Sequence, residues 1–131
     1  MAWDGVKLCP PGLKAGADLS AVGNQYKFVK LSAANTVILC AGVTDKPYGV
    51  LQNTPASGMA ATVCVFGMTK VQGDANLAAG DSIGTSADGQ AAAYTVADTT
   101  KHIVGQVQED NSAAAGLATA FINCASSRVL A

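Results

Sequence analysis

One pattern occurs twice in this chain, first as Lys46-Pro47-Tyr48-Gly49-Val50-Leu51-Gln52 and again, about 56 positions later, as Lys101-His102-Ile103-Val104-Gly105-Gln106-Val107-Gln108. Each copy contains Gly-x-x-Gln within an apolar stretch, passes through a small-residue turn, and reaches a second apolar stretch, at 62–66 or 118–122. Apolar stretches of this length bounded by turns are typical of paired strands. The repeat predicts a small β domain with internal two-fold similarity, since two copies are too few to form a solenoid.

The composition predicts a protein with a modest core and an unusually uncharged surface. Of the 131 residues, 50% are apolar, but only 5% are aromatic and 13% are charged. Charged residues usually make up about 25% of a soluble globular domain. We interpret the deficit as a surface that other copies of the chain, or a partner, cover. The alternative is a Gly- and Ala-rich surface without a special role.

Charge and hydropathy argue against nucleic-acid binding and membrane insertion. The net charge is −1 and the pI is about 5.6, whereas binding to a phosphate backbone requires many Lys and Arg side chains. The apolar run at 36–43 is far shorter than the roughly 20 residues that a spanning helix needs. The first five residues, Met1–Gly5, lack the basic and apolar regions of a secretory signal, so we expect synthesis in the cytoplasm.

Strand-like segments follow one another with turn signals between them. Residues 26–31 alternate apolar or aromatic with charged side chains, which is the period of a half-buried strand. Asp88-Gly89 predicts a tight turn between strands at 83–85 and 91–95, and Asp74 is a candidate N-cap for a single helical turn. Since no segment has a sustained helical period, we predict an all-β fold, a small barrel or sandwich. The other predicted strands are 37–41, 48–52, 61–66, 68–71, 103–108 and 117–124.

The beginning of the chain differs in composition from the rest, and we predict an extended N-terminal arm at 1–25 ahead of a β-rich domain at 26–131. Pro10-Pro11 resists helix formation and removes two backbone donors. Trp3 is the only tryptophan, and aromatic side chains are typical anchors in interfaces. The arm is therefore the expected contact with a partner; the alternative is a frayed terminus in which Trp3 packs locally. The predicted partner-binding residues are Trp3, Leu8, Pro10, Pro11 and Leu13.

The four cysteines are Cys9, Cys40, Cys64 and Cys124, and no Cys-x-x-Cys pair is present. This spacing does not fit a zinc site, and the single His102 does not complete one. Three of the cysteines lie in apolar stretches, where a free thiol packs as a small hydrophobe. We therefore predict no bound metal. Disulfide pairing is the alternative, but synthesis in the cytoplasm gives it little support.

The order of the motifs resembles one protein family, the small capsid cement or head decoration proteins of tailed bacteriophages. The resemblance covers roughly residues 15 to 124 and follows Lys46–Asn53, Leu77–Thr85 and Ile103–Gln108. It implies a β-rich, non-enzymatic virion protein without a cofactor. It also implies a homotrimer that binds the major capsid protein on the outer surface of the phage head and stabilises the shell. The recurring marks of the family are Gly49-Val50, Ala79-Gly80-Asp81 and Gly105.

The chain shows no pattern of catalytic residues. A Ser-His-Asp site would need His102, the only histidine, which we interpret as a surface residue at the start of a strand. Asp74, Asp81 and Asp88 recur every seven positions beside Gly or Ala, so we interpret them as turn-forming residues. The chain also lacks the Gly-rich motifs that bind phosphate. We therefore expect that the protein is not an enzyme.

The alternative function is adhesion, through a carbohydrate-binding site on the virion surface. Sugar sites usually present exposed aromatic rings. Phe28, Phe66 and Phe121 occupy strand positions and are predicted to lie in the core. Outside the arm, Tyr48 and Tyr94 are then the plausible sugar platforms.

Overall fold

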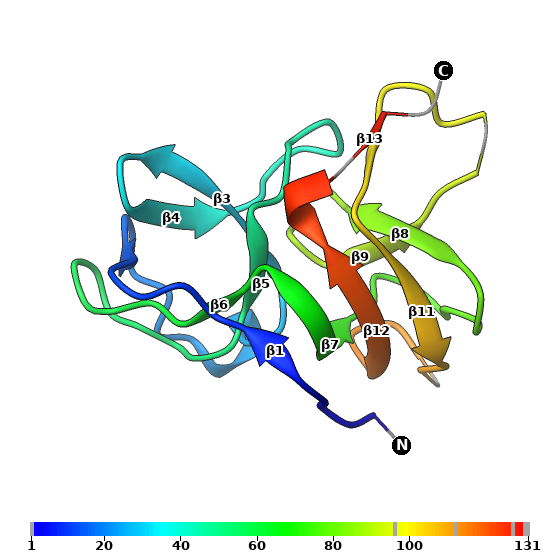
Figure 1. Cartoon of the computed structure of the whole chain (residues 1–131), viewed down its shortest axis with the longest axis horizontal. Coiled ribbons are helices and arrows are strands. Elements are labelled where there is room, and N and C mark those ends of the chain that lie inside the picture. The colour runs from blue at the N-terminus through cyan, green and yellow to red at the C-terminus, as the bar shows by residue number, and fades with distance from the viewer. Residues whose placement is uncertain (1, 96, 112, 127, 130–131) are drawn as a thin grey trace.

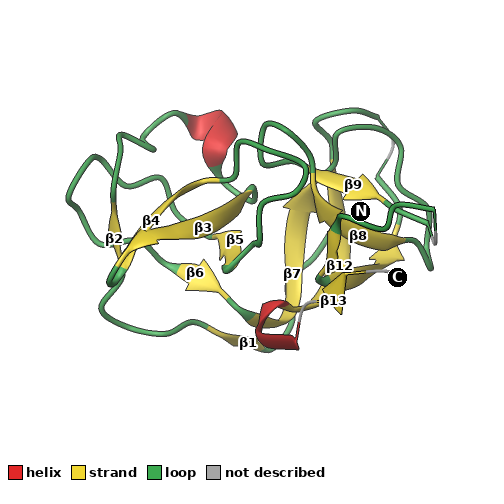
Figure 2. Cartoon of the chain, turned by 90° about the horizontal axis from the view of Figure 1, so that it is seen from above, coloured by secondary structure: helices red, strands yellow, loops and turns green. Residues whose placement is uncertain are grey.

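The computed structural model describes residues 2–95, 97–111, 113–126 and 128–129, and within these ranges the fold is all-β, as predicted. The described helical structure consists of two single turns of 3-10 helix, η1 (Val22–Asn24) and η2 (Cys124–Ser126), both peripheral to the sheets in Figure 2. The helical turn predicted at Asp74 is wrong. Residues 74–75 form a bend instead, and the Asp74 backbone N–H donates to the Ala91 carbonyl at 2.9 Å.

Two main sheets lie side by side in the molecule (Figure 1). Every neighbouring pair in the larger sheet is antiparallel, whereas β2 and β4 of the smaller sheet are parallel. A short third sheet pairs β10 (His102–Ile103) with β13 (Arg128–Val129). The six-stranded sheet has the order β1 (Lys7–Leu8), β7 (Phe66–Gln72), β12 (Leu117–Asn123), β11 (Gly105–Glu109), β8 (Ser82–Thr85), β9 (Ala91–Ala93), and the five-stranded sheet has the order β2 (Lys14–Ala15), β4 (Thr36–Leu39), β3 (Phe28–Ala33), β5 (Gly49–Leu51), β6 (Val63–Cys64).

One stretch of chain belongs to both sheets. Strand β6 ends at Cys64 in the smaller sheet, and β7 begins at Phe66 in the larger one, so the chain changes sheet across Val65. Gly67 follows with a φ of +122°, a conformation that side chains rarely adopt, and β1 lies against its Cα on the side where a Cβ would stand. A glycine there permits both the bend and the close approach of β1.

The five-stranded sheet contributes buried side chains from both of its faces. Phe28, Val50 and Cys64 point toward the six-stranded sheet and share a core with its inward residues. The opposite face packs against the chain between β1 and η1 and against the loop before β6. The shared core includes Val71, Ile83, Val107, Ala118, Ala120 and Ile122, and the second core includes Leu13, Ala15, Leu19, Val29, Val37, Leu51, Ala61 and Val63.

Both copies of the sequence repeat form an antiparallel pair of strands, as predicted. In the first copy β5 pairs with β6, and Leu51 lies opposite Val63. In the second copy β11 pairs with β12, and Val107 lies opposite Ala120. A constant spacing of 56 would have placed Val107 opposite Thr119. The two copies therefore share their local fold but differ by one residue in register.

The predicted hairpin around Asp88-Gly89 is present. Strands β8 and β9 pair antiparallel, with Thr85 opposite Ala91, and Gly89 has a φ of +84°. Glycine adopts a positive φ without a steric cost, and this explains why the dipeptide Asp88-Gly89 predicted the turn correctly.

The N-terminal segment lies against the sheets rather than apart from them. Strand β1 pairs with β7, and β2 pairs with β4. Leu13 and Leu19 are buried in the second core. Whether residues 1–25 act as a separate unit stays a prediction. Among the described residues, no helix is long and apolar enough to cross a membrane.

Three of the four cysteines pack as small hydrophobes, as predicted. Cys40, Cys64 and Cys124 are buried in the shared core, and Cys9 packs against it half-buried, each as a free thiol. Burial is the main cause that raises the pKa of Cys40 and of Cys124 to about 12. These thiols stay protonated at neutral pH and are poor nucleophiles.

Candidate partner-binding face

The outward side of the six-stranded sheet carries several exposed apolar side chains, and three of them form one group. Leu8 is 59% exposed, Phe66 43% and Phe121 42%. Leu8 lies opposite Phe66 in the pairing of β1 with β7. The rings of Phe66 and Phe121 meet edge to face, with centroids 5.2 Å apart and planes at 81°. We call these three residues the apolar face.

The prediction that Phe28, Phe66 and Phe121 all lie in the core is correct for Phe28 and wrong for the other two. Phe28 is buried between the sheets. Successive side chains of a strand point to opposite faces, and the inward places next to the exposed rings are taken by Gly67 and Ile122. Since apolar residues stand on both sides of each ring in the sequence, the sequence pattern did not reveal which face each phenylalanine occupies.

A hollow of about 320 Å³ opens beside the apolar face and includes Phe121 in its lining. Its polar wall includes Gln106, whose Nε2 donates to the Gly80 carbonyl at 3.1 Å. Its apolar lining includes Ile103 and Val104, both buried. An apolar ring beside a hollow is the shape that receives a protruding side chain of a partner.

Trp3 lies across the outward side of the same sheet. Its backbone N–H donates to Thr119 Oγ1 at 2.7 Å, and the Thr119 hydroxyl donates to the Trp3 carbonyl at 3.0 Å. The indole Nε1 donates to Glu109 Oε2 at 2.8 Å. The ring is held on strands β11 and β12 and is still 39% exposed.

The structure separates the five predicted partner-binding residues into three groups. Trp3 and Leu8 lie on the outward side of the six-stranded sheet, where they join the two exposed phenylalanines. Pro10 is half-buried and Pro11 is exposed, both between β1 and β2. Leu13 is 6% exposed and packs in the second core.

Sequence reasoning missed Phe66 and Phe121. A usable signal was present, because Val65-Phe66 and Phe121-Ile122 each place two large apolar residues next to each other in a strand. Adjacent strand residues face opposite sides of a sheet, so each pair predicts one apolar residue on either side. If both sides of the sheet carry large apolar residues, the side that faces away from the core is expected to be covered by a partner.

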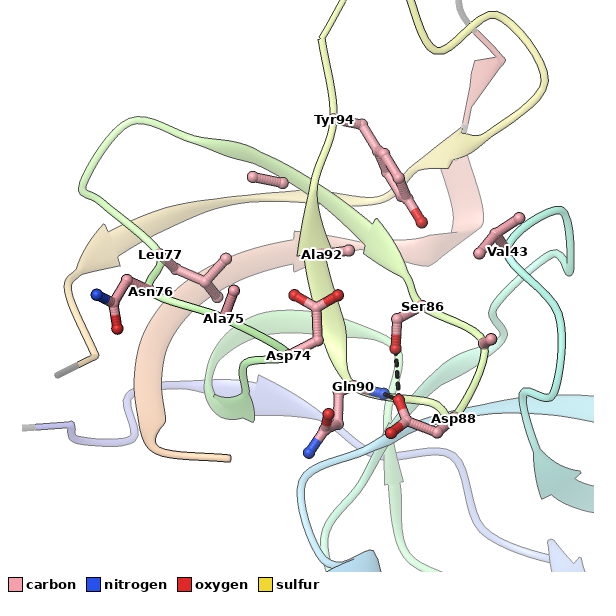
Figure 3. Close-up of a pocket in the computed structure, with 12 residues that line it drawn as sticks. Val43, Asp74, Ala75, Asn76, Leu77, Ser86, Asp88, Gln90, Ala92 and Tyr94 are labelled. Carbon is pink, nitrogen blue, oxygen red and sulfur yellow. Dashed lines mark hydrogen bonds between the residues drawn. The ribbon is translucent and has the colours of Figure 1, made fainter. Parts of the chain in front are cut away.

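A second concave site lies at the β9 edge of the six-stranded sheet, the edge opposite β1 (Figure 3). It is a cleft of about 740 Å³ that Asp74, Asp88 and Tyr94 help to line. Tyr94 is half-buried, and its hydroxyl donates to the Thr85 carbonyl at 2.6 Å. Of the two tyrosines proposed as platforms, Tyr94 thus borders the larger cleft. Tyr48 borders a smaller hollow of about 370 Å³.

Two of the three recurring aspartates form turns, as predicted. Asp81 Oδ2 accepts from the Ala78 N–H at 3.0 Å, and Asp88 Oδ1 accepts from the Gln90 N–H at 3.3 Å. Asp88 Oδ1 also accepts from the Ser86 hydroxyl at 2.6 Å, and this bond is the main cause that lowers the pKa of Asp88. Burial, followed by the charge of Asp88, raises the pKa of Asp74.

The described residues offer no cluster of side chains suited to holding a metal ion. No group of three His, Cys, Asp or Glu side chains in the described ranges is close enough to hold a metal ion. His102 is half-buried at the start of β10, and its Nδ1 has no hydrogen-bond partner among the described atoms. The concave surfaces and the apolar face are the candidate binding surfaces.

No protein-family model matches this chain, and no curated protein matches it. Solved structures with the same fold include the N base of head fiber gp8.5 of bacteriophage phi29, which has a TM-score of 0.65 and 16% sequence identity over 91% of this chain and 96% of that chain. A second is a chain from the capsid of Myoviridae phage XM1, with a TM-score of 0.59 and 19% identity over 91% of this chain and 84% of that chain. The likeness predicted from the motifs is therefore confirmed as a likeness of fold to phage head proteins.

Proposed function

We propose that this chain is a structural, non-enzymatic virion protein that binds the outer surface of an assembled phage capsid and stabilises it. The observation that carries the proposal is the apolar face of Leu8, Phe66 and Phe121, on a fold shared with a phage head fiber base and a phage capsid chain. The partner is the major capsid protein. The proposal places synthesis in the host cytoplasm and the final location on the outside of the head.

The energetics favour a covered apolar face. Burying a Phe side chain completely stabilises a protein by about 1.5–3 kcal/mol. Phe66 and Phe121 are each a little over two-fifths exposed, so a partner that covers both rings gains on the order of 2 kcal/mol from these rings alone. Clusters of this kind, with a hollow beside them, are where binding energy concentrates in interfaces.

Stabilisation of a shell follows from binding the assembled form alone. A ligand that binds the assembled state and not its separated subunits shifts the equilibrium toward assembly by mass action. Contacts that span several capsid subunits add through effective concentration, so each contact can be weak. The low share of charged residues, 13%, fits a chain much of whose surface is covered in this way.

The N-terminal segment contributes to the same contact in this proposal. Trp3 and Leu8 already lie on the outward side of the six-stranded sheet, and Pro10 and Pro11 lie beyond the end of β1. Leu13 anchors the segment to the second core. The oligomer in the proposal is a homotrimer, for which the support is the family resemblance of the motifs.

The test is co-sedimentation of the purified chain with expanded phage heads and with unexpanded precursor shells. We expect saturable binding to expanded heads and a rise in their denaturation temperature. Removing 1–25 would also remove Leu13 and Leu19 from the core, so point variants test the contact better. Phe66→Ser combined with Phe121→Ser should weaken binding by about thirtyfold or more, as expected for loss of a hot spot.

The matched control is Val22→Ser, which removes an apolar side chain that is 85% exposed in η1, away from the six-stranded sheet. It should bind heads as the parent chain does. Trp3→Ala tests the N-terminal contact separately. Absence of binding to either kind of shell would refute the proposed function, and equal binding by the double Phe variant would remove the apolar face from it.

A further inference from the structure

The cleft at the β9 edge combines polar and apolar side chains, unlike the apolar face of Leu8, Phe66 and Phe121. It lies between the 73–77 loop and the turn that joins β8 to β9. In Figure 3 the Asp74 carboxylate lies near the middle of the lining residues, with Tyr94 and Val43 toward one end. Its volume of about 740 Å³ is within the range of small-molecule sites.

The aromatic wall of the cleft is fixed before any ligand binds. The Tyr94 hydroxyl donates to the Thr85 carbonyl at 2.6 Å, and the Tyr94 backbone N–H donates to the Ser82 carbonyl at 2.9 Å. One edge of the ring lies against Gly84 of β8, where a Cβ would come within 3.1 Å of it. Binding therefore costs little side-chain entropy at this ring.

The polar groups of the cleft are mainly acceptors, and some of them are also fixed. Asp88 is held by the Ser86 hydroxyl at 2.6 Å and by the Gln90 N–H. The Gln90 side-chain amide donates to Gln72 Oε1 at 2.6 Å. The Asp74 carboxylate projects among the lining residues in Figure 3. Carboxylates accept hydrogen bonds from hydroxyl groups, and two oxygens on one carboxylate match two neighbouring hydroxyls.

The floor and the charge of the cleft narrow the class of ligand. Ala75, Leu77 and Ala92 supply apolar surface, and none of the described lining residues is Lys or Arg. A phosphate, sulfate or carboxylate ligand is therefore disfavoured beside Asp74 and Asp88. A pyranose ring presents apolar C–H groups on one face and hydroxyl donors around its edge, which matches a tyrosine wall, an alanine floor and carboxylate acceptors.

We propose that this cleft binds an uncharged hexopyranose unit of a glycan, with Tyr94 against the apolar face of the sugar and Asp74 accepting from its hydroxyl groups. This is a second binding activity on the edge of the sheet opposite β1. It does not depend on the capsid proposal. The apolar face includes Leu8 of β1, whereas the cleft lies at β9, the opposite edge strand of the same sheet. Binding to a head through the apolar face therefore leaves the cleft open.

The test uses amide chemical-shift mapping with the methyl glycosides of glucose, galactose, mannose and N-acetylglucosamine, each at millimolar concentration. We expect at least one of them to shift the amide signals of residues that line the cleft, such as Ala92 and Tyr94, in a saturable way. Tyr94→Ala should weaken that binding by about tenfold or more through loss of the aromatic wall. Absence of a saturable shift with all four sugars would overturn the proposal.

Three further variants keep the result interpretable. Tyr94→Ala removes the bond to Thr85 and can lower stability, so Asp74→Ala, in an exposed loop, tests the acceptor role separately and should also weaken binding. Asp18→Ala, an exposed aspartate outside the cleft, and Tyr48→Ala, the other candidate platform, are the controls and should bind normally. Unchanged binding by both Asp74→Ala and a folded Tyr94→Ala would overturn the site.

A cationic ligand tests whether the cleft prefers a basic side chain to a sugar. The methylamide of lysine should shift the same amides less than the best sugar; if it binds more tightly than every sugar, the cleft is a site for a basic side chain and the glycan proposal fails. Head binding by Tyr94→Ala should equal that of the parent chain. This result separates a failure of the glycan site from a failure of the proposed capsid contact.

Discussion

The two copies of the Gly-x-x-Gln pattern form the same strand pair but differ in their surroundings. In the first copy Gln52 is a junction: its Nε2 donates to Thr69 Oγ1 at 2.9 Å, and its Oε1 accepts from Lys7 Nζ at 3.1 Å. It thus joins the end of β5 to strands β7 and β1. In the second copy Gln108 is exposed and lies in a β-bulge, between Val107 and Glu109.

The comparison shows which part of the pattern builds the strand pair. The glycine has the same role in both copies, because a Cβ on Gly49 or on Gly105 would stand 2.5 Å from a carbonyl oxygen of the partner strand, that of Cys64 or of Phe121. The glutamine has a role only where a second sheet passes beside it. The glycine is needed wherever the two strands of a pair approach closely, which is a local requirement. The hydrogen bonds of Gln52 between the sheets depend instead on how the whole chain folds.

The largest expected effect comes from the shared glycines. Gly49→Ala and Gly105→Ala should each destabilise the protein by about 3 kcal/mol, because the new Cβ forces the paired strands apart. Chemical denaturation with urea measures both losses. Gly23→Ala is the control, since no atom lies within 4 Å of its would-be Cβ, and it should change the free energy of unfolding little. A tolerated alanine at either strand position would show that the two glycines are not equivalent.

A smaller effect distinguishes the two glutamines. Gln52→Ala should cost about 1–2 kcal/mol, because it leaves the buried Thr69 hydroxyl without this donor and removes the acceptor of Lys7. Gln108→Ala, at an exposed position, should change stability by less than about 0.5 kcal/mol. The same urea titration measures both. Equal losses would contradict the assignment of Gln52 as a junction.

The smallest effect concerns the residue four positions before the glycine of each copy. Asp45 accepts from Lys30 Nζ at 2.9 Å and from the Ala41 and Gly42 N–H groups, and the bond from Lys30 is the largest cause that lowers the pKa of Asp45 below its ordinary 3.8. Lys101 stands four positions before Gly105, as Asp45 does before Gly49. A lowered carboxyl pKa stabilises the fold above the unfolded pKa, and this stabilisation is lost as the pH falls through the folded pKa.

Asp45→Asn should therefore lower stability at pH 7 by less than about 1 kcal/mol, since the pair is partly exposed and screened by solvent. As the pH falls through the lowered pKa of Asp45, the difference in stability between variant and parent should shrink, because the parent carboxyl becomes protonated as well. Lys101→Gln is the control and should show no such pH dependence. Thermal unfolding at several pH values makes the measurement, and a constant difference across this range would argue against the ion pair.

Local chemistry explains the predictions that succeeded. The turn at Asp88-Gly89 and the strand pairs of both copies depend on a few adjacent residues, and each was predicted with boundaries close to the observed ones. The failed prediction at Asp74 shows the limit, because residues 74–75 form a bend whose backbone is hydrogen-bonded to Ala91, 17 positions away. The candidate binding surfaces were predicted only in part: Trp3, Leu8 and Tyr94 were named, whereas the exposed places of Phe66 and Phe121 were not.

By itself, the sequence determined the all-β class, the two strand pairs, the tight turn and the likeness to phage head proteins, because period-two patterning and turn residues act over short distances. Tertiary structure alone decided that the first strand pair ends one sheet while the second lies inside the other, and that the two registers differ by one residue. It also decided that Phe66 and Phe121 face outward. In a strand flanked by apolar residues on both sides, the choice of inner face is made by whichever sheet packs against it.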